Sequence, residues 1–433
     1  MSTHNPSFPP SLWAAVTPAA PDFPSLQDDI EADVVVVGGG FTGLSTALHL
    51  AETGRRVVVL EAAAPGWGAS GRNNGQVIPT LTRPDPDDIV ARWGEAGERF
   101  VTLLRDSAAD LFALAARHGI DCEAEQTGWI QPAHTPGRLR ISERRFEQWR
   151  RHGASVALLD RDEVRRRVGS DLWHGGWTAT TGGHINPLAL ARGLARVAAE
   201  KGAQIFAGSP VVAIGRQSDR WQARTERGTV TAHGLVLATN AYSGVFADTV
   251  APALAREVVP VLSWQMATEP LDAAQRQTIV PGREAVSDTH GDLYFFRYDA
   301  RNRLVTGGAL IVPLAGADRL RRRIGARLAR IFPQLGPVSF DFVWNGYIGM
   351  TRDYLPHLHR LGPNGYAWAG CNGRGVALSV AMGRELARAV TGTPERDLPM
   401  PIEPIQPIPF HGIARRLASM MLAVYRWRDS REI

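Results

Sequence analysis

Residues 32–51, ADVVVVGGGFTGLSTALHLA, decide the fold of this chain. The four valines at 34–37 predict a buried strand of a parallel sheet, and the alanine- and leucine-rich part after Gly43 predicts a helix. Between them Gly38, Gly40 and Gly43 form the pattern Gly-x-Gly-x-x-Gly. The first glycine permits a tight turn, the second lets the backbone approach a pyrophosphate, and the third lets the helix pack closely on the strand.

The next segment completes a dinucleotide-binding unit. A second buried strand is predicted at 57–60, and Glu61 follows it, 18 residues after Gly43. In this position a carboxylate accepts hydrogen bonds from both ribose hydroxyls and repels a 2′-phosphate. The predicted ligand is therefore FAD or NAD rather than NADP.

The loop at 66–76, GWGASGRNNGQ, favours FAD over NAD. Its backbone, amide and hydroxyl groups supply many hydrogen-bond donors, which suit a flavin ring and its ribityl chain. The competing interpretation is a solvated surface loop.

Composition excludes several classes of protein. The chain has 433 residues, of which 44% are hydrophobic and 21% charged, and no apolar run approaches the roughly 18 residues of a membrane span. Lys201 is the single lysine, so Schiff-base and phosphate-loop lysine chemistry is nearly excluded. Cys122 and Cys371 share no metal-ligand spacing, which predicts a reducing, cytoplasmic setting. The net charge of +5 is modest, and the arginines are predicted to lie on solvated helix faces rather than to bind nucleic acid.

Taken together, these motifs resemble the D-amino acid oxidase superfamily of FAD-dependent amine oxidoreductases, and most of all the bacterial group that contains gamma-glutamylputrescine oxidoreductase. The resemblance covers nearly the whole chain. The segments that carry it, besides the glycine turn, are 11–13 (SLW), 70–73 (SGRN), 184–187 (HINP), 238–242 (ATNAY) and 373–375 (GRG).

The resemblance implies an α/β fold, in which a Rossmann-like FAD-binding domain is joined to a discontinuous α+β substrate domain. The FAD-binding domain is expected at 29–88, 181–249 and 341–400, and the substrate domain at 89–180 and 250–340. Residues 1–28 form an N-terminal arm. A tail at 401–433 ends in an amphipathic helix, whose apolar stripe is expected to dock on the protein itself rather than on a membrane or partner. The stripe consists of Ile413, Leu417, Met421, Val424 and Tyr425.

The resemblance also assigns the FAD-binding residues. FAD is expected to be non-covalent, because the position of the covalent-flavin cysteine in sarcosine oxidases matches Gly346. In the family, the valine that matches Val211 touches the adenine through its backbone. The expected FAD-binding residues are Gly38, Gly40, Phe41, Thr42, Gly43, Glu61, Ala62, Gly68, Ala69, Ser70, Gly71, Arg72, Asn73, Gly75, Gln76, Val211, Thr239, Asn240, Tyr242, Gly346, Gly373, Arg374, Gly375 and Val376.

The implied reaction is oxidation of a C–N bond in an amine to an imine, which water then hydrolyses, with no protein base required. Two lysines of the sarcosine oxidases, one that holds the substrate carboxylate and one that promotes reaction with oxygen, match Ala377 and Val305. Sarcosine is therefore not the expected substrate, and oxygen or another acceptor reoxidises FAD. Arg374 replaces the family's usual histidine and places a cation next to either the flavin or the substrate. If it is not there only to stabilise the reduced flavin, Arg374 together with Arg297 predicts an anionic substrate such as a gamma-glutamylated amine, an N-substituted amino acid or an aminophosphonate. The substrate-pocket candidates are Tyr294, Arg297, Asn345, Tyr347 and Arg374.

Two other functions fit parts of the sequence. An NAD-dependent dehydrogenase would share the glycine turn, but it predicts a short loop after Glu61 and a compact separate catalytic domain. A non-catalytic flavin-binding module would bind FAD without turnover. No metal site is expected.

Overall fold

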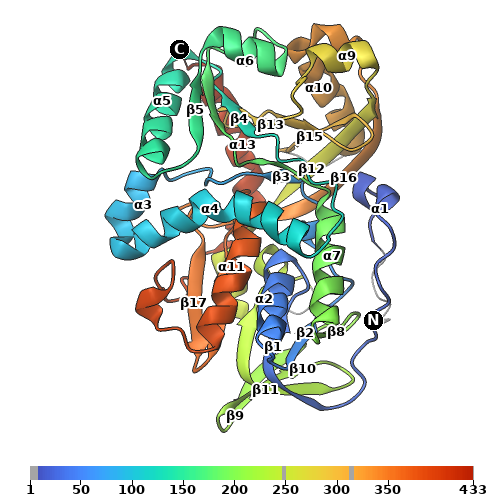
Figure 1. The fold of residues 1–433 in the computed structure, drawn as a ribbon, viewed down its shortest axis with the longest axis vertical. Helices are drawn as coiled ribbons and strands as arrows, with labels where there is room; N and C mark the ends of the chain where they lie inside the picture. The colour runs from blue at the N-terminus through green and yellow to red at the C-terminus, as the bar shows by residue number, and fades with distance from the viewer. Residues whose placement is uncertain (1–7, 246–249, 312–315, 433) are drawn as a thin grey trace.

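The computed structural model describes residues 8–245, 250–311 and 316–432. Within these residues the chain forms two eight-stranded sheets and a two-stranded one. In Figure 1 the sheet that contains β1 occupies the lower half of the molecule and the sheet that contains β12 the upper half. No helix among the described residues is long and apolar enough to cross a membrane.

The glycine turn lies at the centre of the first sheet. Strand β1 (Ile30–Val37) pairs in parallel with β2 (Val57–Leu60) on one side and with β11 (Thr229–Leu237) on the other. The valines at 34–37 are buried, as the uninterrupted apolar run predicts. The remaining strands of this sheet are β8 (Gln204–Phe206), β9 (Ala213–Gln217), β10 (Arg220–Arg224), β17 (His357–Gly362) and β18 (Gly365–Ala369).

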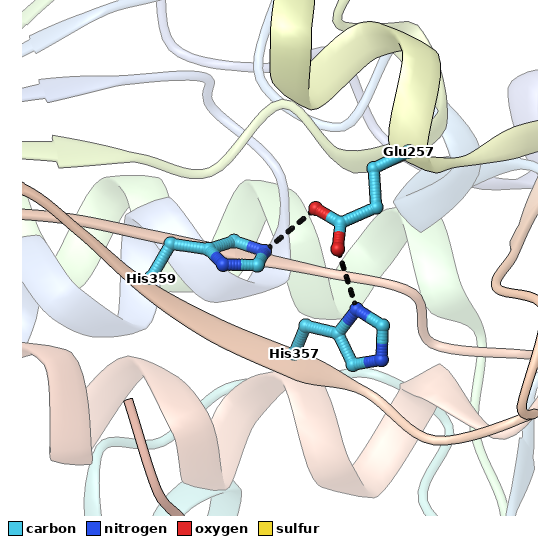
Figure 2. Close-up of side chains that lie close together, drawn as sticks. All are labelled: Glu257, His357 and His359. Atoms are coloured by element: carbon cyan, nitrogen blue, oxygen red, sulfur yellow. Dashed lines mark hydrogen bonds and ion pairs between the residues drawn. The ribbon is translucent and has the colours of Figure 1, made fainter. Parts of the chain in front are cut away.

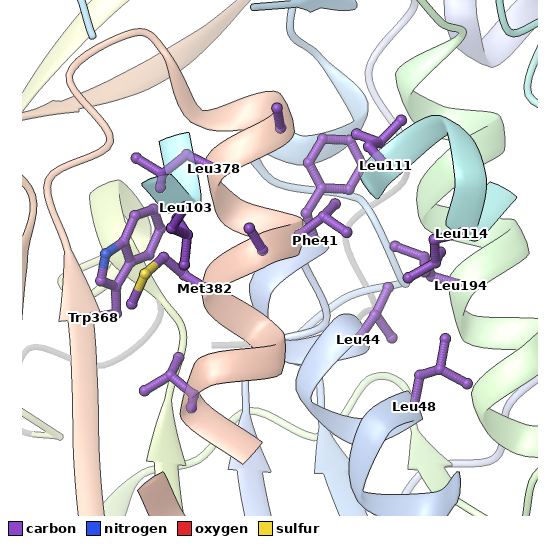
Figure 3. Close-up of a cluster of buried hydrophobic side chains, with 14 of the residues drawn as sticks. Phe41, Leu44, Leu48, Leu103, Leu111, Leu114, Leu194, Trp368, Leu378 and Met382 are labelled. Atoms are coloured by element: carbon purple, nitrogen blue, oxygen red, sulfur yellow. The ribbon is translucent and has the colours of Figure 1, made fainter. Parts of the chain in front are cut away.

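Four helices pack together beside this sheet. Helix α2 (Phe41–Glu52) follows the glycine turn and packs against α11 (Gly375–Val390) and α7 (Pro187–Glu200), and α4 (Glu95–Arg117) packs against α11. Figure 3 shows buried side chains of these helices meeting Trp368 of β18 in one apolar cluster. The labelled members are Phe41, Leu44, Leu48, Leu103, Leu111, Leu114, Leu194, Trp368, Leu378 and Met382.

The second sheet has the strand order β16-β12-β15-β14-β13-β4-β6-β5. Its two longest strands, β12 (Val259–Pro270) and β16 (Phe340–Met350), pair antiparallel along most of their length. The shorter strands are β4 (Trp129–Pro132), β5 (Val156–Leu159), β6 (Gly176–Ala179), β13 (Ala285–Ser287), β14 (Phe295–Tyr298) and β15 (Arg303–Gly308). Strands β3 (Gln76–Val77) and β7 (Gly183–His184) form the small sheet. Apart from those near the two ends of the chain, the remaining helices are α3 (Pro86–Trp93), α5 (Pro136–Arg151), α6 (Arg161–Val168), α8 (Pro252–Glu257), α9 (Ala273–Thr278) and α10 (Gly316–Ile331).

One predicted domain boundary is wrong. The boundary at residue 341 falls inside β16, which pairs with β12 in the second sheet. The third segment of the first sheet begins only at β17. We therefore place this boundary after Met350.

The described part of the N-terminal arm, residues 8–28, contributes to the core through α1, and residues 1–7 of the predicted arm lie outside the described residues. In α1 (Leu12–Val16) both Leu12 and Trp13 are fully buried. The indole Nε1 of Trp13 donates to the backbone oxygen of Asn73 at 2.9 Å, and its ring meets that of Trp344 edge to face. The arm thereby supports the loop at 66–76 from outside.

The C-terminal tail is attached differently from the prediction. It forms α12 (His411–Leu417) and α13 (Met421–Asp429), and the predicted docking of the whole apolar stripe is wrong. Of the stripe, only Tyr425 turns inward, with its hydroxyl 2.8 Å from that of Tyr354. Leu422, which lies outside the stripe, is buried, and polar contacts also hold the tail: Asp429, for example, accepts from the backbone N–H of Gly291 at 2.9 Å. The stripe residues that remain exposed are Ile413, Leu417, Met421 and Val424.

Arg297 on β14 links the two parts of the protein. Its buried guanidinium donates to the backbone oxygens of Asn74, Ile185 and Tyr298 at 2.9, 2.7 and 2.6 Å, and it lies over the ring of Trp13. Burial lowers the pKa of Arg297 to about 10. The hydrogen-bond donors of this predicted substrate residue are therefore satisfied by three backbone carbonyls rather than by a ligand.

Replacing Arg297 with Met should destabilise the protein, because buried carbonyls lose their donors. We expect a loss of about 2–4 kcal/mol, seen as a lower midpoint of thermal unfolding. Arg301→Met, at an exposed position, is the matched control and should unfold within about 0.5 kcal/mol of the wild type. Equal midpoints for the two variants would contradict this role.

Candidate cofactor and substrate site

A cavity of about 410 Å³ lies where the two halves of the protein meet. The first sheet contributes the carboxyl ends of its strands, including Val37 of β1, Leu60 of β2 and Ala238 directly after β11. Ligands of doubly wound sheets bind at this edge. The second sheet contributes residues of β12 and β16 to the opposite wall.

The glycine turn forms one end of the cavity. Gly38 has a φ of +109°, and a Cβ there would lie 2.9 Å from the Ala238 oxygen. A Cβ on Gly40 would lie 2.9 Å from the Ser70 hydroxyl, so a side chain would fill the space in front of α2. The helix begins at Phe41, whose backbone N–H donates to the Ser70 hydroxyl at 2.9 Å. This helix N-terminus, in a cradle that a Cβ would fill, fits a pyrophosphate.

Glu61 lies beside the turn and lines the cavity. Its carboxylate accepts from the backbone N–H groups of Gly39 at 2.6 Å and Ala63 at 2.8 Å. Burial raises the pKa of Glu61, whereas the backbone donors act in the opposite direction. These two bonds fix the carboxylate at the end of β2, in the position that ribose recognition requires.

The loop at 66–76 is folded against the cavity and is not a solvated loop. The Asn73 side chain donates to the backbone oxygen of Ser70 and accepts from the backbone N–H of Gly75. Arg72 is buried, and its Nε donates to the Trp67 oxygen at 2.7 Å. Its Nη2 is buried without a hydrogen-bond partner among the described residues. A buried free donor on the cavity wall fits a ligand with acceptor atoms, such as a flavin ring.

Most predicted FAD-binding residues line this cavity. The exceptions are Gly43 and Gly71, which allow close packing instead. A Cβ would lie 1.9 Å from the Gly38 oxygen if placed on Gly43, and 2.3 Å from the Gly66 oxygen if placed on Gly71. The predicted residues on the wall are Gly38, Gly40, Phe41, Thr42, Glu61, Ala62, Gly68, Ala69, Ser70, Arg72, Asn73, Gly75, Gln76, Val211, Thr239, Asn240, Tyr242, Gly346, Gly373, Arg374, Gly375 and Val376.

The five substrate-pocket candidates separate into two groups. Arg374 and Tyr347 line the cavity, whereas Tyr294, Arg297 and Asn345 do not. Tyr294 stacks on His290 at 4.0 Å between ring centroids and lies under the guanidinium of Arg327. Successive residues of an extended chain point to opposite sides. The cavity is therefore lined by the neighbours of Tyr294, which are Leu293 and Phe295.

Arg374 is a buried cation in the wall of the cavity. Its side chain lies at the start of α11, over the ring of Trp129, with Nη1 3.5 Å from the Ser287 hydroxyl. Among the described residues no carboxylate lies within 4.0 Å of it. Burial lowers the pKa of Arg374 to about 9, and the nearby Arg145 adds repulsion. An anion in the cavity would compensate this desolvated charge.

Two polar residues of the opposite wall were not predicted. Ser263 and Gln265 lie two residues apart on β12, so both face the cavity. The Gln265 side chain is buried; its Nε2 donates to the Ser263 hydroxyl at 3.2 Å, and its Oε1 has no partner among the described residues. A serine and a glutamine two residues apart inside an otherwise apolar strand could have predicted this polar patch from the sequence.

The positions that match the sarcosine oxidase lysines are apolar and buried. Ala377 packs in the core beside the first sheet. Val305 packs against Trp13 and Trp344. Neither lines the cavity, so these positions present no charge to a ligand.

Comparison with known proteins gives the family. Residues 33–389 match the family model DAO, described as FAD dependent oxidoreductase. The chain is 36% identical over 388 residues to gamma-glutamylputrescine oxidoreductase of Escherichia coli, covering 89% of this chain and 90% of that protein. It is 29% identical over 438 residues to the probable oxidoreductase OrdL of Rhizobium meliloti, over the full length of both.

The fold agrees with this match. The crystal structure of glycine oxidase from Geobacillus kaustophilus superposes with a TM-score of 0.69 at 23% identity, covering 83% of this chain and 95% of that one. L-proline dehydrogenase from P. horikoshii gives a TM-score of 0.70 at 20% identity, covering 84% and 94%. The chain therefore belongs to the DAO family and is an FAD-dependent oxidoreductase.

Proposed function

We propose that this enzyme oxidises the C–N bond of an amine or amino-acid-like substrate that carries an anionic group. The product is an imine, which water hydrolyses to an aldehyde or ketone and an amine or ammonia. The observation that carries the proposal is the buried Arg374, which lines the cavity and has no carboxylate partner among the described residues. The names of two relatives, gamma-glutamylputrescine oxidoreductase and glycine oxidase, agree with an amine substrate.

FAD would lie along the cavity, held without a covalent bond. The N-terminus of α2 would bind the pyrophosphate and Glu61 the ribose, while Val211 would contact the adenine. The loops at 66–76 and 373–376 would surround the flavin ring. Bound FAD supplies the redox chemistry by accepting a hydride equivalent from the carbon next to nitrogen. Gly346 beside Arg72 offers no side chain for covalent attachment.

The substrate's own amine must lose its proton before oxidation. No histidine, aspartate or lysine lines the described cavity, and Glu61 is engaged by Gly39 and Ala63. The positive charges of Arg72 and Arg374 disfavour an ammonium group nearby, and so favour the neutral amine. Gln265 Oε1 could accept a hydrogen bond from that amine and orient it.

The anionic end of the substrate would bind Arg374. A guanidinium can donate two parallel hydrogen bonds to a carboxylate or a phosphonate. The substrate classes that fit are gamma-glutamylated amines, N-substituted amino acids and aminophosphonates. A screen of these classes against simple diamines, following peroxide and dye reduction separately, tests the substrate and shows whether oxygen or another acceptor reoxidises the enzyme.

We also propose that the enzyme works in the reducing cytoplasm. The support is that both cysteines are free and that burial raises the pKa of the Cys122 thiol to about 12. A thiol in this state is chemically inert.

Replacing Glu61 with Gln should weaken FAD binding. A glutamine amide can accept from only one of the two backbone N–H groups and is a weaker acceptor for ribose hydroxyls. We expect a loss of roughly 1–3 kcal/mol, which is about 5- to 150-fold in the dissociation constant. Titration of the apoprotein with FAD measures it, with Glu226→Gln at an exposed position as the control. An unchanged dissociation constant for FAD would contradict the assignment of Glu61 to the cofactor site.

Replacing Arg374 with Met should weaken binding of anionic amines selectively. The lost charge-assisted hydrogen bonds correspond to roughly 1.5–3 kcal/mol, or about 10- to 150-fold in apparent affinity. Neutral amines of the same length should lose much less. Arg352→Met, at an exposed position near the end of β16, is the control. The assignment fails if Arg374→Met keeps the wild-type preference, or if simple diamines outcompete every anionic amine.

The rate of flavin reduction should rise with pH between about 6 and 9. The reason is that the hydride leaves a carbon next to a nitrogen with a free lone pair, and no histidine, aspartate or lysine on the described cavity wall can take the amine proton. Rapid-mixing measurements without oxygen would record this profile. A rate that falls steadily with pH would contradict oxidation of a neutral amine.

A further inference from the structure

Two histidines and a glutamate meet outside the cofactor cavity. His357 and His359 lie two residues apart at the start of β17, so they project from the same face of the strand. Glu257 is the last residue of α8, and its carboxylate points between the two rings (Figure 2). Its Oε1 lies 2.9 Å from His357 Nδ1 and its Oε2 lies 2.8 Å from His359 Nε2. Glu257 and His359 are almost completely buried.

The outer nitrogen of each ring is already occupied. His359 Nδ1 lies 2.8 Å from the backbone oxygen of Glu403, which can only accept, so Nδ1 carries a hydrogen. His357 Nε2 lies 3.1 Å from the carboxylate of Asp353 and is assigned its hydrogen in the same way. In neutral rings, the nitrogens that face Glu257 are therefore bare. Histidines that bind metal ions have this arrangement, in which a carbonyl or carboxylate holds the other ring nitrogen.

A ring nitrogen without a hydrogen and a carboxylate oxygen both carry lone pairs and repel each other, so a positive charge between them is required. Three carboxylates belong to the group: those of Glu257, Asp353 and Glu403. The guanidinium of Arg92 lies 2.9 Å from Asp353 and 3.8 Å from Glu403, and it compensates one of the three. If both rings are neutral, one divalent cation would balance the two remaining negative charges. Without a metal ion, both histidines would have to be protonated to balance them, and their ring centroids are only 5.9 Å apart.

The geometry favours a cation over a proton at His359. Its Nε2 and Oε2 of Glu257 are 2.8 Å apart, yet both are buried without a hydrogen bond of acceptable angle to any described residue. A shared proton must lie near the line that joins the two atoms. A metal ion lies off that line, because it binds each atom at about 2.0–2.2 Å. The orientation of the ring and carboxylate thus suits a metal ion.

We propose that Glu257, His357 and His359 bind one divalent metal ion of the zinc class. The three ligand atoms lie within 4.8 Å of one another. Two imidazoles and one carboxylate form a donor set that zinc prefers, whereas calcium and magnesium prefer oxygen ligands alone. Asp353 and the Glu403 carbonyl orient the two rings. The ion would bridge α8, which directly follows the cavity-lining Val250 and Ala251, to the edge strand of the first sheet.

Zinc binding to the FAD-loaded, tag-free enzyme tests the proposal. After dialysis against a chelator and then metal-free buffer, calorimetric titration with zinc chloride should give one site per chain, and magnesium chloride should give none. Glu257→Gln and His359→Gln should abolish this site. Asp353→Asn, which removes only an orienting group, should weaken it about 10- to 100-fold. His233→Gln, at an exposed histidine, is the matched control and should bind like the wild type.

Thermal unfolding gives an independent readout and shows whether the variants fold. Zinc should raise the unfolding midpoint of the wild type and of His233→Gln, but not that of Glu257→Gln, because an ion bound only by the folded state stabilises it. If Glu257→Gln and His359→Gln lose their flavin or do not fold, the zinc affinity of Asp353→Asn decides: a reduced affinity supports the site, and an unchanged affinity contradicts it. The proposal is overturned if the wild type binds no zinc, or if all variants bind it as the wild type does.

Discussion

The close packing of α2 on β1 is the constraint on which the site depends. A Cβ on Gly43 would lie 1.9 Å from the oxygen of Gly38, so only glycine lets the helix begin directly at the end of the strand. This contact directs the N-terminus of α2 into the cavity, while the neighbouring β2 brings Glu61 to the same edge. Helix α11 also packs closely on α2, since a Cβ on Gly383 would lie 2.4 Å from that of Ser45. The helix that carries Arg374 is thus fixed relative to the cofactor end of the cavity.

Two buried arginines show how burial and partners decide the role of a cation. Both Arg297 and Arg374 are desolvated, which lowers the pKa of each. Arg297 donates to three backbone carbonyls and holds the loop at 66–76 against the second sheet. Arg374 lies over the Trp129 ring, has one long hydrogen bond, 3.5 Å to a serine hydroxyl, and lines the cavity. Binding of an anion would offset the free energy that burial of the Arg374 charge costs. The substrate proposal rests on this contrast between Arg374 and Arg297.

Most of the predicted FAD-binding residues line one cavity, because the glycine turn, Glu61 and the loop at 66–76 are local patterns tied to backbone geometry. The substrate end depends on strand register, where a shift of one residue reverses the side that a residue faces. This is why Phe295 rather than Tyr294 lines the cavity. The boundary within β16 and the exposed stripe of the tail depend on contacts that no local pattern reports. The cluster of Glu257 with His357 and His359 joins residues about a hundred positions apart, and folding alone brings them together.

The central claim is that the bound flavin oxidises an amine that carries an anionic group. Its most direct test is titration of the FAD-loaded enzyme with a panel of amines in the absence of oxygen, following loss of the visible absorbance of the flavin. We predict that at least one gamma-glutamylated amine, N-substituted amino acid or aminophosphonate bleaches the flavin, and does so faster than its neutral analogue. A flavin that dithionite reduces but none of these amines reduces would contradict the account.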